Sequence, residues 1–423
     1  MAHWRPRGDP AMTRPTGKTW LLTLIVVATS GCVSLPLRDY SEREQAIAEI
    51  ADIPDARFWA DDPAAFIKAR PAPTPGKSQA MLAISGGSDD GAYGAGFLNG
   101  WSQSGKRPEF TVVTGVSTGA LLAPFALLGE RYDDRIKAAY TTISQRDIYH
   151  RRPAPLALLS TSVATTEPLW ELLNHYVTDA VIDEVAAAHR AGRRLFVGTA
   201  NLDAQRGVVW NMGAIATSGA ADRYRLFRRV LLASSAVPAL FPPVIIDARA
   251  GGKPIREAHV DGATAGSLLV VPPGVVTTSG IASTGAELYL LVNGALGGDF
   301  KIVKGGILSI AGRAFTLATT SAVREQTATA YLWAKRYGAH YHLTYIDSTF
   351  EHGPPHKPFD TAYMNRLYEF GLRAGRASRW ALAPPSGDPA APANGDPADQ
   401  ATPNAGLPER PSLAMPGRAL VGR

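Results

Sequence analysis

The sequence places a serine in a glycine-rich turn where it could act as a nucleophile. Ser117 is the centre of Gly115-Val-Ser117-Thr-Gly119, which lies between a β-branched run at 110–114 and an Ala/Leu-rich stretch at 118–128. A strand–turn–helix connection of this kind holds a serine at the carboxyl end of a sheet, beside the N–H groups of a helix N-terminus. Those groups favour negative charge, so the pattern indicates acyl transfer from Ser117. The alternative is a glycine-rich turn whose serine only caps the helix.

A second glycine-rich turn, Ser85-Gly-Gly-Ser-Asp-Asp-Gly91, follows the apolar run 80–84. Unhindered backbone N–H groups in such a turn can bind an anion, including the oxyanion formed during acyl transfer. A phosphate-binding loop is the rival interpretation. Its Lys-Ser/Thr ending is absent, and Asp89 and Asp90 would repel phosphate. The dinucleotide-binding fingerprint fails as well, because Ser88 interrupts the glycine spacing.

A third pattern, His259-Val-Asp261-Gly-Ala, supplies a carboxylate with small neighbours. A nucleophilic serine needs a base to accept its proton, and Asp261 is the candidate. The alternative is that Asp-Gly only forms a β-turn. His259 lies two residues away, and a lone histidine of this kind is more often structural.

The three patterns in this order, Gly-Gly-x-x-x-Gly-Ala-Tyr-x-Ala-Gly, G-x-S-T-G and Asp-Gly-Ala, resemble the patatin-like phospholipase family. The segment 233–244 (ASSAVPALFPPV) adds to the resemblance, which spans about residues 80–376. It implies an α/β chain with a three-layer α/β/α patatin-like fold and a mostly parallel central sheet. It also implies a serine acyl-hydrolase, a phospholipase A or lipid esterase, that cleaves acyl esters of membrane lipids with no metal and no cofactor.

The resemblance assigns roles residue by residue. Ser117 matches the nucleophile and Asp261 the general base of a Ser–Asp dyad. The oxyanion hole matches Gly86, Gly87 and Ser88, and the glycines that support the motifs are Gly91, Gly115, Gly119 and Gly262. The chain departs from the family pattern twice. Ser88 stands where a third glycine is usual, and would be strained if that backbone needs glycine. Asp90 stands where the family has Arg or Lys, and an inward carboxylate would oppose oxyanion charge.

Two other functions compete with this one. The first is an α/β-hydrolase esterase whose base is a late histidine, one of His340, His342, His352 and His356. For His340 and His342, which alternate on an expected strand, packing is the favoured role. The second is a catalytically silent lipoprotein that keeps the fold and binds acyl lipid or a partner protein. The presence of Ser88 and Asp90 in place of the usual family residues favours this silent lipoprotein.

Hydrophobic patterning predicts the elements that position these residues. Strands are expected at 80–84, 110–114, 194–199, 208–210, 288–292 and 341–346, and helices at 93–102, 118–128, 307–337 and from 360 or 361 to about 380. Alternation of strands and helices indicates a sheet covered on both faces. In the helix at 307–337 the apolar residues Ile307, Leu308, Ile310 and Phe315, near Lys301, Lys304 and Arg313, are expected in the core. Contact with a membrane is the alternative.

The first 32 residues have the pattern of an export signal. A basic leader precedes the apolar run 20–28, and Thr29-Ser-Gly-Cys32 resembles a bacterial lipobox, in which the single cysteine is lipidated. We expect a signal peptide at 1–32, a polar Pro-rich linker at 33–78, the catalytic domain at 79–382 and a disordered Pro/Ala/Gly-rich tail at 383–423. The expected location is the cell envelope, at the periplasmic face of the outer membrane.

The composition limits the kinds of binding partner that we expect. The formal net charge is +6, yet no dense Lys/Arg stripe interleaved with aromatic residues occurs, so nucleic acid is not an expected partner. An acyl lipid and a membrane surface are the expected partners. One cysteine excludes an internal disulfide and any cysteine-based zinc site.

Overall fold

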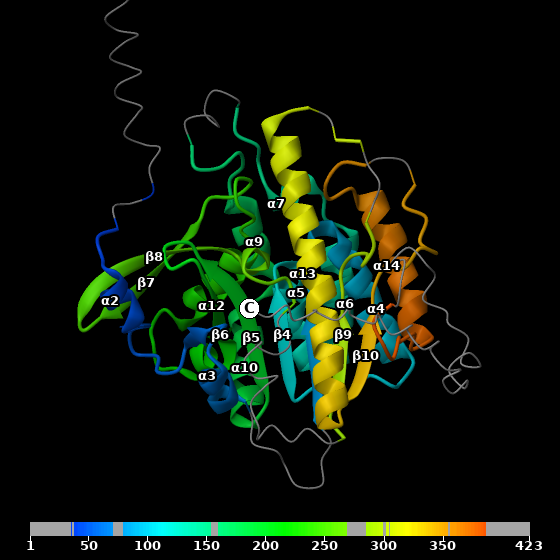
Figure 1. The fold of residues 1–423 in the computed structure, drawn as a ribbon, viewed down its shortest axis with the longest axis horizontal. Coiled ribbons are helices and arrows are strands. Elements are labelled where there is room, and N and C mark those ends of the chain that lie inside the picture. The colour runs from blue at the N-terminus through cyan, green and yellow to red at the C-terminus, as the bar shows by residue number, and fades with distance from the viewer. Residues whose placement is uncertain are drawn as a thin grey trace, which may run out of the picture.

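The structure is a computed structural model that describes residues 35, 38–70, 79–153, 160–268, 285–298, 302–303, 305–353 and 356–385. Within these residues one ten-stranded sheet lies between two layers of helices (Figure 1). The predicted three-layer α/β/α architecture is thereby confirmed. The predicted signal peptide at 1–32, with Cys32, lies outside the described residues, as do residues 71–78 of the predicted linker and 386–423 of the predicted tail.

Five strands form the parallel centre of the sheet. Their order is β10 (His340–Thr344), β9 (Glu287–Leu291), β3 (Ala80–Ile84), β4 (Val112–Val116) and β5 (Arg194–Asn201). All residues of β3 and β4 are buried, as expected for strands covered on both faces. Because the five strands are parallel, their carboxyl ends share one edge of the sheet.

An antiparallel extension continues the sheet beyond β5. Its strands are β6 (Arg206–Asn211), β7 (Val244–Ala250), β8 (Lys253–Asp261), β1 (Ala48–Glu49) and β2 (Arg57–Trp59). The hairpin between β7 and β8 turns at Gly251 and Gly252, whose φ angles of 57° and 90° suit glycine. Strand β8 runs antiparallel to β5 and places Asp261 opposite Thr199. Of the extension, the sequence pattern predicted only the strand at 208–210.

Helices cover the two faces of the sheet unequally. One layer contains α4 (Gly91–Gln103), α5 (Thr118–Leu128), α6 (Asp133–Thr141), α7 (Gln145–Ile148), α9 (Glu167–Tyr176), α10 (Asp179–Arg190), α11 (Met212–Thr217), α12 (Arg223–Ser234) and α14 (Thr361–Arg376). The other contains α3 (Pro63–Ala69) and α13 (Ile307–Tyr337), which crosses the front of the sheet in Figure 1. Strand β3 serves both layers because its side chains alternate. Leu82 and Ile84 join the first core, and Met81 and Ala83 join the second.

Helices α4 and α14 lie unusually close together. A Cβ added at Gly96 would lie 2.0 Å from the carbonyl oxygen of Tyr368, and one at Gly375 would lie 2.1 Å from that of Phe97. Glycines therefore allow the two backbones to touch. Helix α4 begins directly after the 85–91 turn, so this contact holds that turn against the C-terminal helix.

The described part of the predicted linker differs from a spacer, because residues 38–70 pack on the domain. Helix α2 (Glu42–Ala46) is followed by β1, which pairs with β7, and by β2, which pairs with β6. Ile50, Ile53 and Phe66 are buried. The polar composition concealed this docking, since these few apolar residues are widely spaced.

An ion pair fastens this segment to β8. The Arg57 guanidinium forms two hydrogen bonds with the buried Glu257 carboxylate, one of them 2.7 Å long, and Gln45 donates a third at 2.6 Å. Burial alone would raise the pKa of Glu257, but the bonds from Arg57 and His259 outweigh it and lower that pKa to about 2. The carboxylate is therefore charged, and it depends on Arg57.

Removing one partner of a buried ion pair should be costly. We predict that Arg57→Ala lowers the free energy of unfolding by about 3–5 kcal/mol, because Glu257 is left charged and buried. Lys68→Ala breaks an exposed pair with Asp55 and should cost less than about 1 kcal/mol. Urea unfolding of both variants measures the difference. Equal small losses would contradict a docked N-terminal segment.

The helix predicted at 307–337 occurs with the same bounds, but its first half is not in the core as expected. Ile310 is 58% exposed, and Leu317 is 68% exposed. Among the side chains of α13 that the structure describes, the buried ones begin at Val323; the side chains of Ile307 and Leu308 lie outside that description. The reason is length, since a 31-residue helix extends well past strands of five residues. No described helix is both long and apolar enough to cross a bilayer.

Candidate active site

Ser117 occupies the predicted turn between β4 and α5. Its backbone has φ 54° and ψ −126°, a conformation that is strained for a residue with a side chain. The Ser117 N–H donates to Ser234 Oγ at 3.0 Å, and Ser234 Oγ donates to the carbonyl oxygen of Gly198 at 2.7 Å. Two fixed bonds thus hold the turn at the carboxyl edge of the parallel strands.

Glycines make this turn possible by removing side chains from backbone contacts. A Cβ at Gly115 would lie 2.3 Å from the carbonyl oxygen of Gly119, and one at Gly119 would lie 2.3 Å from that of Ile84. No larger residue fits at either position. The other two predicted supporting glycines, Gly91 and Gly262, lie equally close to their neighbours, Thr118 and Gly198.

Asp261 ends β8 and meets Ser117. Its Oδ2 accepts a 2.6 Å hydrogen bond from Ser117 Oγ, and its Oδ1 accepts one of 2.8 Å from the Ala263 N–H. Ser117 is 7% exposed and Asp261 is 1% exposed. Burial raises the pKa of Asp261 to about 7, although both hydrogen bonds lower it. A carboxylate with a pKa near neutrality, bonded to a serine hydroxyl, is suited to accept that proton.

The 86–91 turn borders Ser117, with one difference from the predicted oxyanion hole. A Cβ at Gly86 would lie 3.2 Å from the Ser117 Cβ, so this residue lies against the serine. However, the Gly86 N–H donates to the carbonyl oxygen of Ser267 at 3.1 Å. That donor is engaged. The N–H groups of Gly87 and Ser88 are the remaining predicted donors.

Asn293, which sequence reasoning missed, clamps this turn. It follows β9; its backbone N–H donates to Ser85 Oγ at 2.9 Å, and its Nδ2 donates to the Ser85 carbonyl oxygen at 2.8 Å. Its Oδ1 accepts from the Gly94 N–H. A Cβ at Gly87 would lie 1.9 Å from the Asn293 carbonyl oxygen, so Gly87 is required by contact. A polar residue directly after a buried strand is the only signal the sequence offered.

Ser234 was missed in a similar way. It lies within the 233–244 segment that the resemblance singled out, but nothing in that segment showed which residue mattered. Its hydroxyl connects the backbone of Ser117 to that of β5. Ser235 adds a longer bond, of 3.4 Å, to the Ser117 carbonyl oxygen.

The two departures from the family pattern have visible structural consequences. Ser88 has φ 56°, so the expected backbone strain is present. Asp90 turns toward α14, where its Oδ1 accepts a 2.6 Å hydrogen bond from the Tyr363 hydroxyl. Burial, and then the neighbouring Asp89, raise the pKa of Asp90 to about 7. Asp89 accepts from the Phe359 N–H at 3.0 Å. Both acids therefore bind the turn to the α14 side of the domain.

His259 belongs to a buried network rather than to the dyad. Its Nδ1 lies 3.0 Å from Thr199 Oγ1, and its Nε2 lies 3.1 Å from Glu257 Oε2. Burial lowers the pKa of His259 despite the Glu257 carboxylate. Its role is structural, as the sequence favoured.

The four late histidines are engaged elsewhere. His340 Nδ1 and His342 Nε2 lie 2.7 and 2.6 Å from the two carboxylate oxygens of Glu287. His352 and His356 are exposed, and His356 stacks on the Tyr363 ring. Among the described residues, none of these histidines has a recorded bond to Ser117 or Asp261, and no group of three or more His, Cys, Asp or Glu side chains could hold a metal ion.

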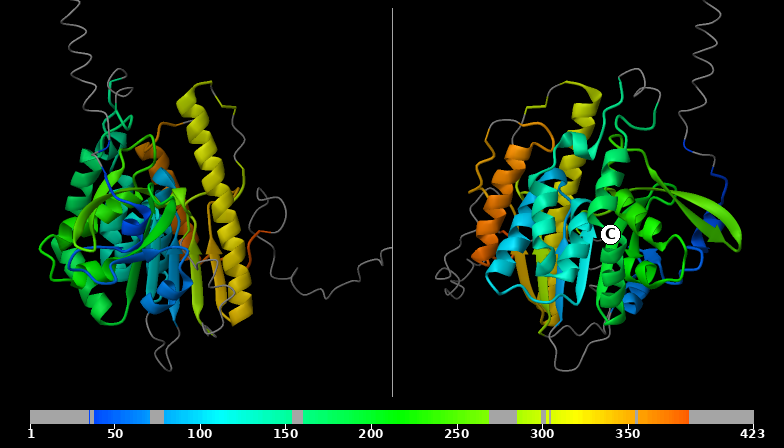
Figure 2. Two further views of the ribbon diagram at one scale, coloured as in Figure 1. Left: turned by 60° about the vertical axis from the view of Figure 1, so that its left-hand side comes forward. Right: turned by 180° about the vertical axis from the view of Figure 1, so that it is seen from behind.

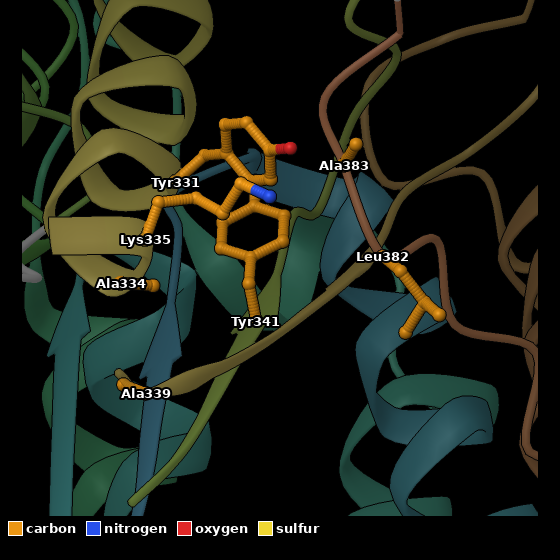
Figure 3. Close-up of a pocket in the computed structure, with 7 residues that line it drawn as sticks. All are labelled: Tyr331, Ala334, Lys335, Ala339, Tyr341, Leu382 and Ala383. Carbon is orange, nitrogen blue, oxygen red and sulfur yellow. The ribbon is translucent and has the colours of Figure 1, made fainter. Parts of the chain in front are cut away.

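A pocket of about 380 Å³ lies away from these residues, between the second half of α13, β10 and residues 382–383 (Figure 3). Its polar lining residues are Tyr331, Lys335 and Tyr341. None of the predicted site residues lines it. It is therefore no part of the candidate active site.

Comparison with known proteins identifies the class. Residues 82–272 match the family model for patatin-like phospholipase, a range that includes Ser117 and Asp261. These residues form a patatin-like phospholipase domain, and the members of that family are lipid-hydrolysing enzymes. No curated protein matches the chain.

Two solved structures resemble the chain weakly. VipD from Legionella pneumophila is 12% identical, with a TM-score of 0.36 over 73% of this chain and 68% of that chain. The type III effector protein ExoU is 11% identical, with a TM-score of 0.26 over 71% of this chain and 53% of that chain. The chain thus spans about half the length of ExoU. Likeness at this level carries no argument about substrate.

The strained backbone of Ser117 generates a stability prediction. Ser117→Gly and Ser117→Ala both remove the bond to Asp261, but only glycine relieves the positive φ. We expect the glycine variant to be more stable than the alanine variant by about 1 kcal/mol, after the entropy of glycine in the unfolded chain is included. Thermal unfolding of the two proteins measures this. An alanine variant as stable as the glycine variant would argue against the strained turn.

The raised pKa of Asp261 generates a second prediction. Its folded pKa, about 7, exceeds the usual value near 4, so the native state holds a proton that the unfolded state has lost between those pH values. Stability from this group therefore falls as pH rises through that window. The stability of Asp261→Asn relative to the wild type should therefore increase between pH 5 and pH 8, by of order 1 kcal/mol or more. Urea unfolding at both pH values tests this; a pH-independent difference would count against a protonated native carboxyl.

Proposed function

We propose that the chain is a serine acyl-hydrolase that cleaves acyl esters of membrane lipids with a Ser117–Asp261 dyad. The observation that supports this most is the 2.6 Å hydrogen bond from Ser117 Oγ to Asp261 Oδ2 in a buried setting at the carboxyl edge of the sheet. A hydroxyl bonded to a carboxylate whose pKa is about 7 is an activated nucleophile.

The reaction follows from this geometry. The Asp261 carboxylate accepts the Ser117 hydroxyl proton as Oγ attacks the ester carbonyl carbon, and the carbonyl oxygen becomes an oxyanion. The N–H groups of Gly87 and Ser88, with the positive N-terminal end of α5, stabilise that charge. When the tetrahedral intermediate collapses, the proton on Asp261 passes to the departing lyso-lipid alcohol. Water, deprotonated by Asp261, then attacks the acyl-serine carbonyl carbon. When this second tetrahedral intermediate collapses, the bond to Ser117 Oγ breaks, Asp261 returns the proton to Oγ, and the fatty acid leaves.

The competing functions have weaker support. A late-histidine esterase would need one of the four histidines beside Ser117, whereas His340 and His342 bind Glu287 and the other two are exposed. A silent lipoprotein was favoured by Ser88 and Asp90. Asp90 bonds the Tyr363 hydroxyl, so repulsion between its carboxylate and an oxyanion no longer supports that function. The strained backbone of Ser88 remains the basis for it.

Substitution of the dyad tests the proposed activity. Ser117→Ala and Asp261→Asn should each lower the release of fatty acid from mixed phospholipid micelles by at least about 10³-fold, because nucleophile and base act as one unit. His342→Gln is the control, because it retains the dyad and should release fatty acid at the wild-type rate. A fluorophosphonate probe should label the wild type at Ser117. A folded wild type with neither turnover nor labelling would support the silent lipoprotein instead.

The pH dependence tests the base separately. Because Asp261 must be deprotonated to accept the proton, and burial raises its pKa to about 7, kcat/KM should rise with pH and level off above about 7. A water-soluble short-chain ester serves as substrate, so that the profile does not include micelle effects. A rate already constant from pH 5 upward would contradict Asp261 as the base.

We also propose that the chain is an envelope lipoprotein at the periplasmic face of the outer membrane, anchored through Cys32. The basic leader, the apolar run 20–28 and the small residues before Cys32 support this. Metabolic labelling with an alkyne fatty acid should mark the wild type in a diderm bacterial host, and Cys32→Ser should abolish the label. Equal labelling of both proteins would exclude Cys32 as the acylated residue.

A further inference from the structure

The first half of α13 projects beyond the body of the domain. Residues 309–322, which we call the projecting turns, contain no buried side chain. At 1.5 Å per residue they extend for about 21 Å. Below them, Arg324 donates to the Leu296 carbonyl oxygen at 2.7 Å and Gln326 accepts from the Leu268 N–H at 2.9 Å. Figure 2 shows the upper end of the helix standing clear of the neighbouring elements.

The projecting turns rise from the edge of the sheet that carries the dyad. Helix α13 connects the parallel strands β9 and β10, so it begins near the carboxyl end of β9 and runs back along the sheet. Ser117 follows the carboxyl end of β4 at that same edge. Gln326 Oε1 accepts from the N–H of Leu268. The residue before Leu268, Ser267, accepts from the Gly86 N–H through its carbonyl oxygen. The helix thus leaves the domain beside the loops that surround Ser117.

Large apolar side chains are exposed on this projection. Ile310 is 58% exposed and Leu317 is 68% exposed, and the seven-residue spacing places them on one helix face. Just before the helix, Ile302 is 81% exposed and Val303 is 41% exposed. Single exposed apolar residues are ordinary, but four within residues 302–317 form a surface that water solvates poorly.

The charge of this segment is of one sign. Residues 300–322 contain Lys301, Lys304 and Arg313 and no Asp or Glu. An apolar face accompanied by basic residues is the composition of helices that bind the interface of anionic membranes. A protein partner would not require a segment devoid of acids, whereas an anionic lipid surface repels them.

We propose that the projecting turns of α13, with Ile302 and Val303, insert into the surface of an anionic bilayer and bring the Ser117 edge of the sheet to the lipid. The proposal rests on the proposed function, because that function takes its substrate from a membrane. The apolar side chains enter the boundary between headgroups and acyl chains, and the basic residues contact the anionic headgroups. The dyad then lies beside the bilayer rather than facing bulk water.

Labelling at single cysteines tests the insertion without requiring turnover. Cys32 is the only cysteine, so the full chain with Cys32→Ser accepts one new cysteine carrying an environment-sensitive nitrobenzoxadiazole dye. Ile310→Cys and Leu317→Cys report on the projecting turns. Leu332→Cys is the matched control, because Leu332 is 64% exposed on the same helix at its other end. Ser117→Ala is included in each protein so that lipid is not hydrolysed.

The expected result is a blue shift and brighter emission at 310 and 317, but not at 332, on addition of phosphatidylglycerol-containing vesicles. Vesicles of phosphatidylcholine alone should give a weaker response, and high salt should reduce the response to anionic vesicles. No response at 310 and 317, or an equal response at all three positions, would overturn the proposal. So would a blue shift that depends on protein concentration without vesicles, which would indicate a second copy of the chain on this surface.

Hydrolysis separates this proposal from the proposed function. Ile310→Asp/Leu317→Asp should lower the hydrolysis of anionic vesicles at least about tenfold, since two apolar contacts with the interface are lost. Hydrolysis of a water-soluble short-chain ester should be unchanged, and Leu332→Asp should leave both rates unchanged. Equal loss on both substrates would overturn the docking role. Absence of soluble-ester hydrolysis in the wild type would count against the dyad while leaving the dye experiment decisive for docking.

Discussion

The hydrogen bond between Ser117 and Asp261 joins two buried groups that are 144 residues apart, and much of the structure exists to bring them together. Burying a carboxylate is unfavourable unless its charge is compensated or its proton retained. Here the compensation is only a serine hydroxyl and one backbone N–H. The surroundings must therefore be rigid, because a small displacement of β8 would separate Asp261 from the Ser117 hydroxyl. The cost in stability and the basicity of Asp261 are two results of the same desolvation.

That rigidity comes from backbone contacts that admit no side chain. Gly115 and Gly119 approach each other, Gly119 approaches the end of β3, and Gly262 approaches β5. On the opposite side, Asn293 holds the 85–91 turn through Ser85. Strands β3, β4, β5, β8 and β9 are thus connected around one serine. The Arg57–Glu257 pair extends this framework to the N-terminal segment, because Glu257, His259 and Asp261 alternate along one face of β8.

Much of this arrangement could be predicted from the sequence where local pattern decides structure. Buried parallel strands are continuous apolar runs, so β3, β5 and α13 were located to within a few residues, and glycine spacing identified Ser117. Prediction failed where long-range pairing decides. Strands β1, β7 and β8 are recognisable only through the strands with which they pair. The N–H of Gly86 is engaged because the carbonyl oxygen of Ser267, far along the chain, accepts from it. The first half of α13 is exposed because the helix is longer than the strands it covers. Ser234 and Asn293 act through backbone atoms of distant residues, which composition does not reveal.

The docking of residues 38–70 bears on how an anchored form of the chain would behave. If acylated Cys32 is the attachment point, only five residues lie between it and Arg38, where the described body begins. A chain of that length spans at most about 20 Å. The catalytic body would therefore be confined to a thin layer above the leaflet, and its search for substrate would be lateral diffusion in two dimensions. Under such confinement, turnover depends on the number of substrate molecules per unit area of membrane, and the bulk concentration of lipid has little meaning for it.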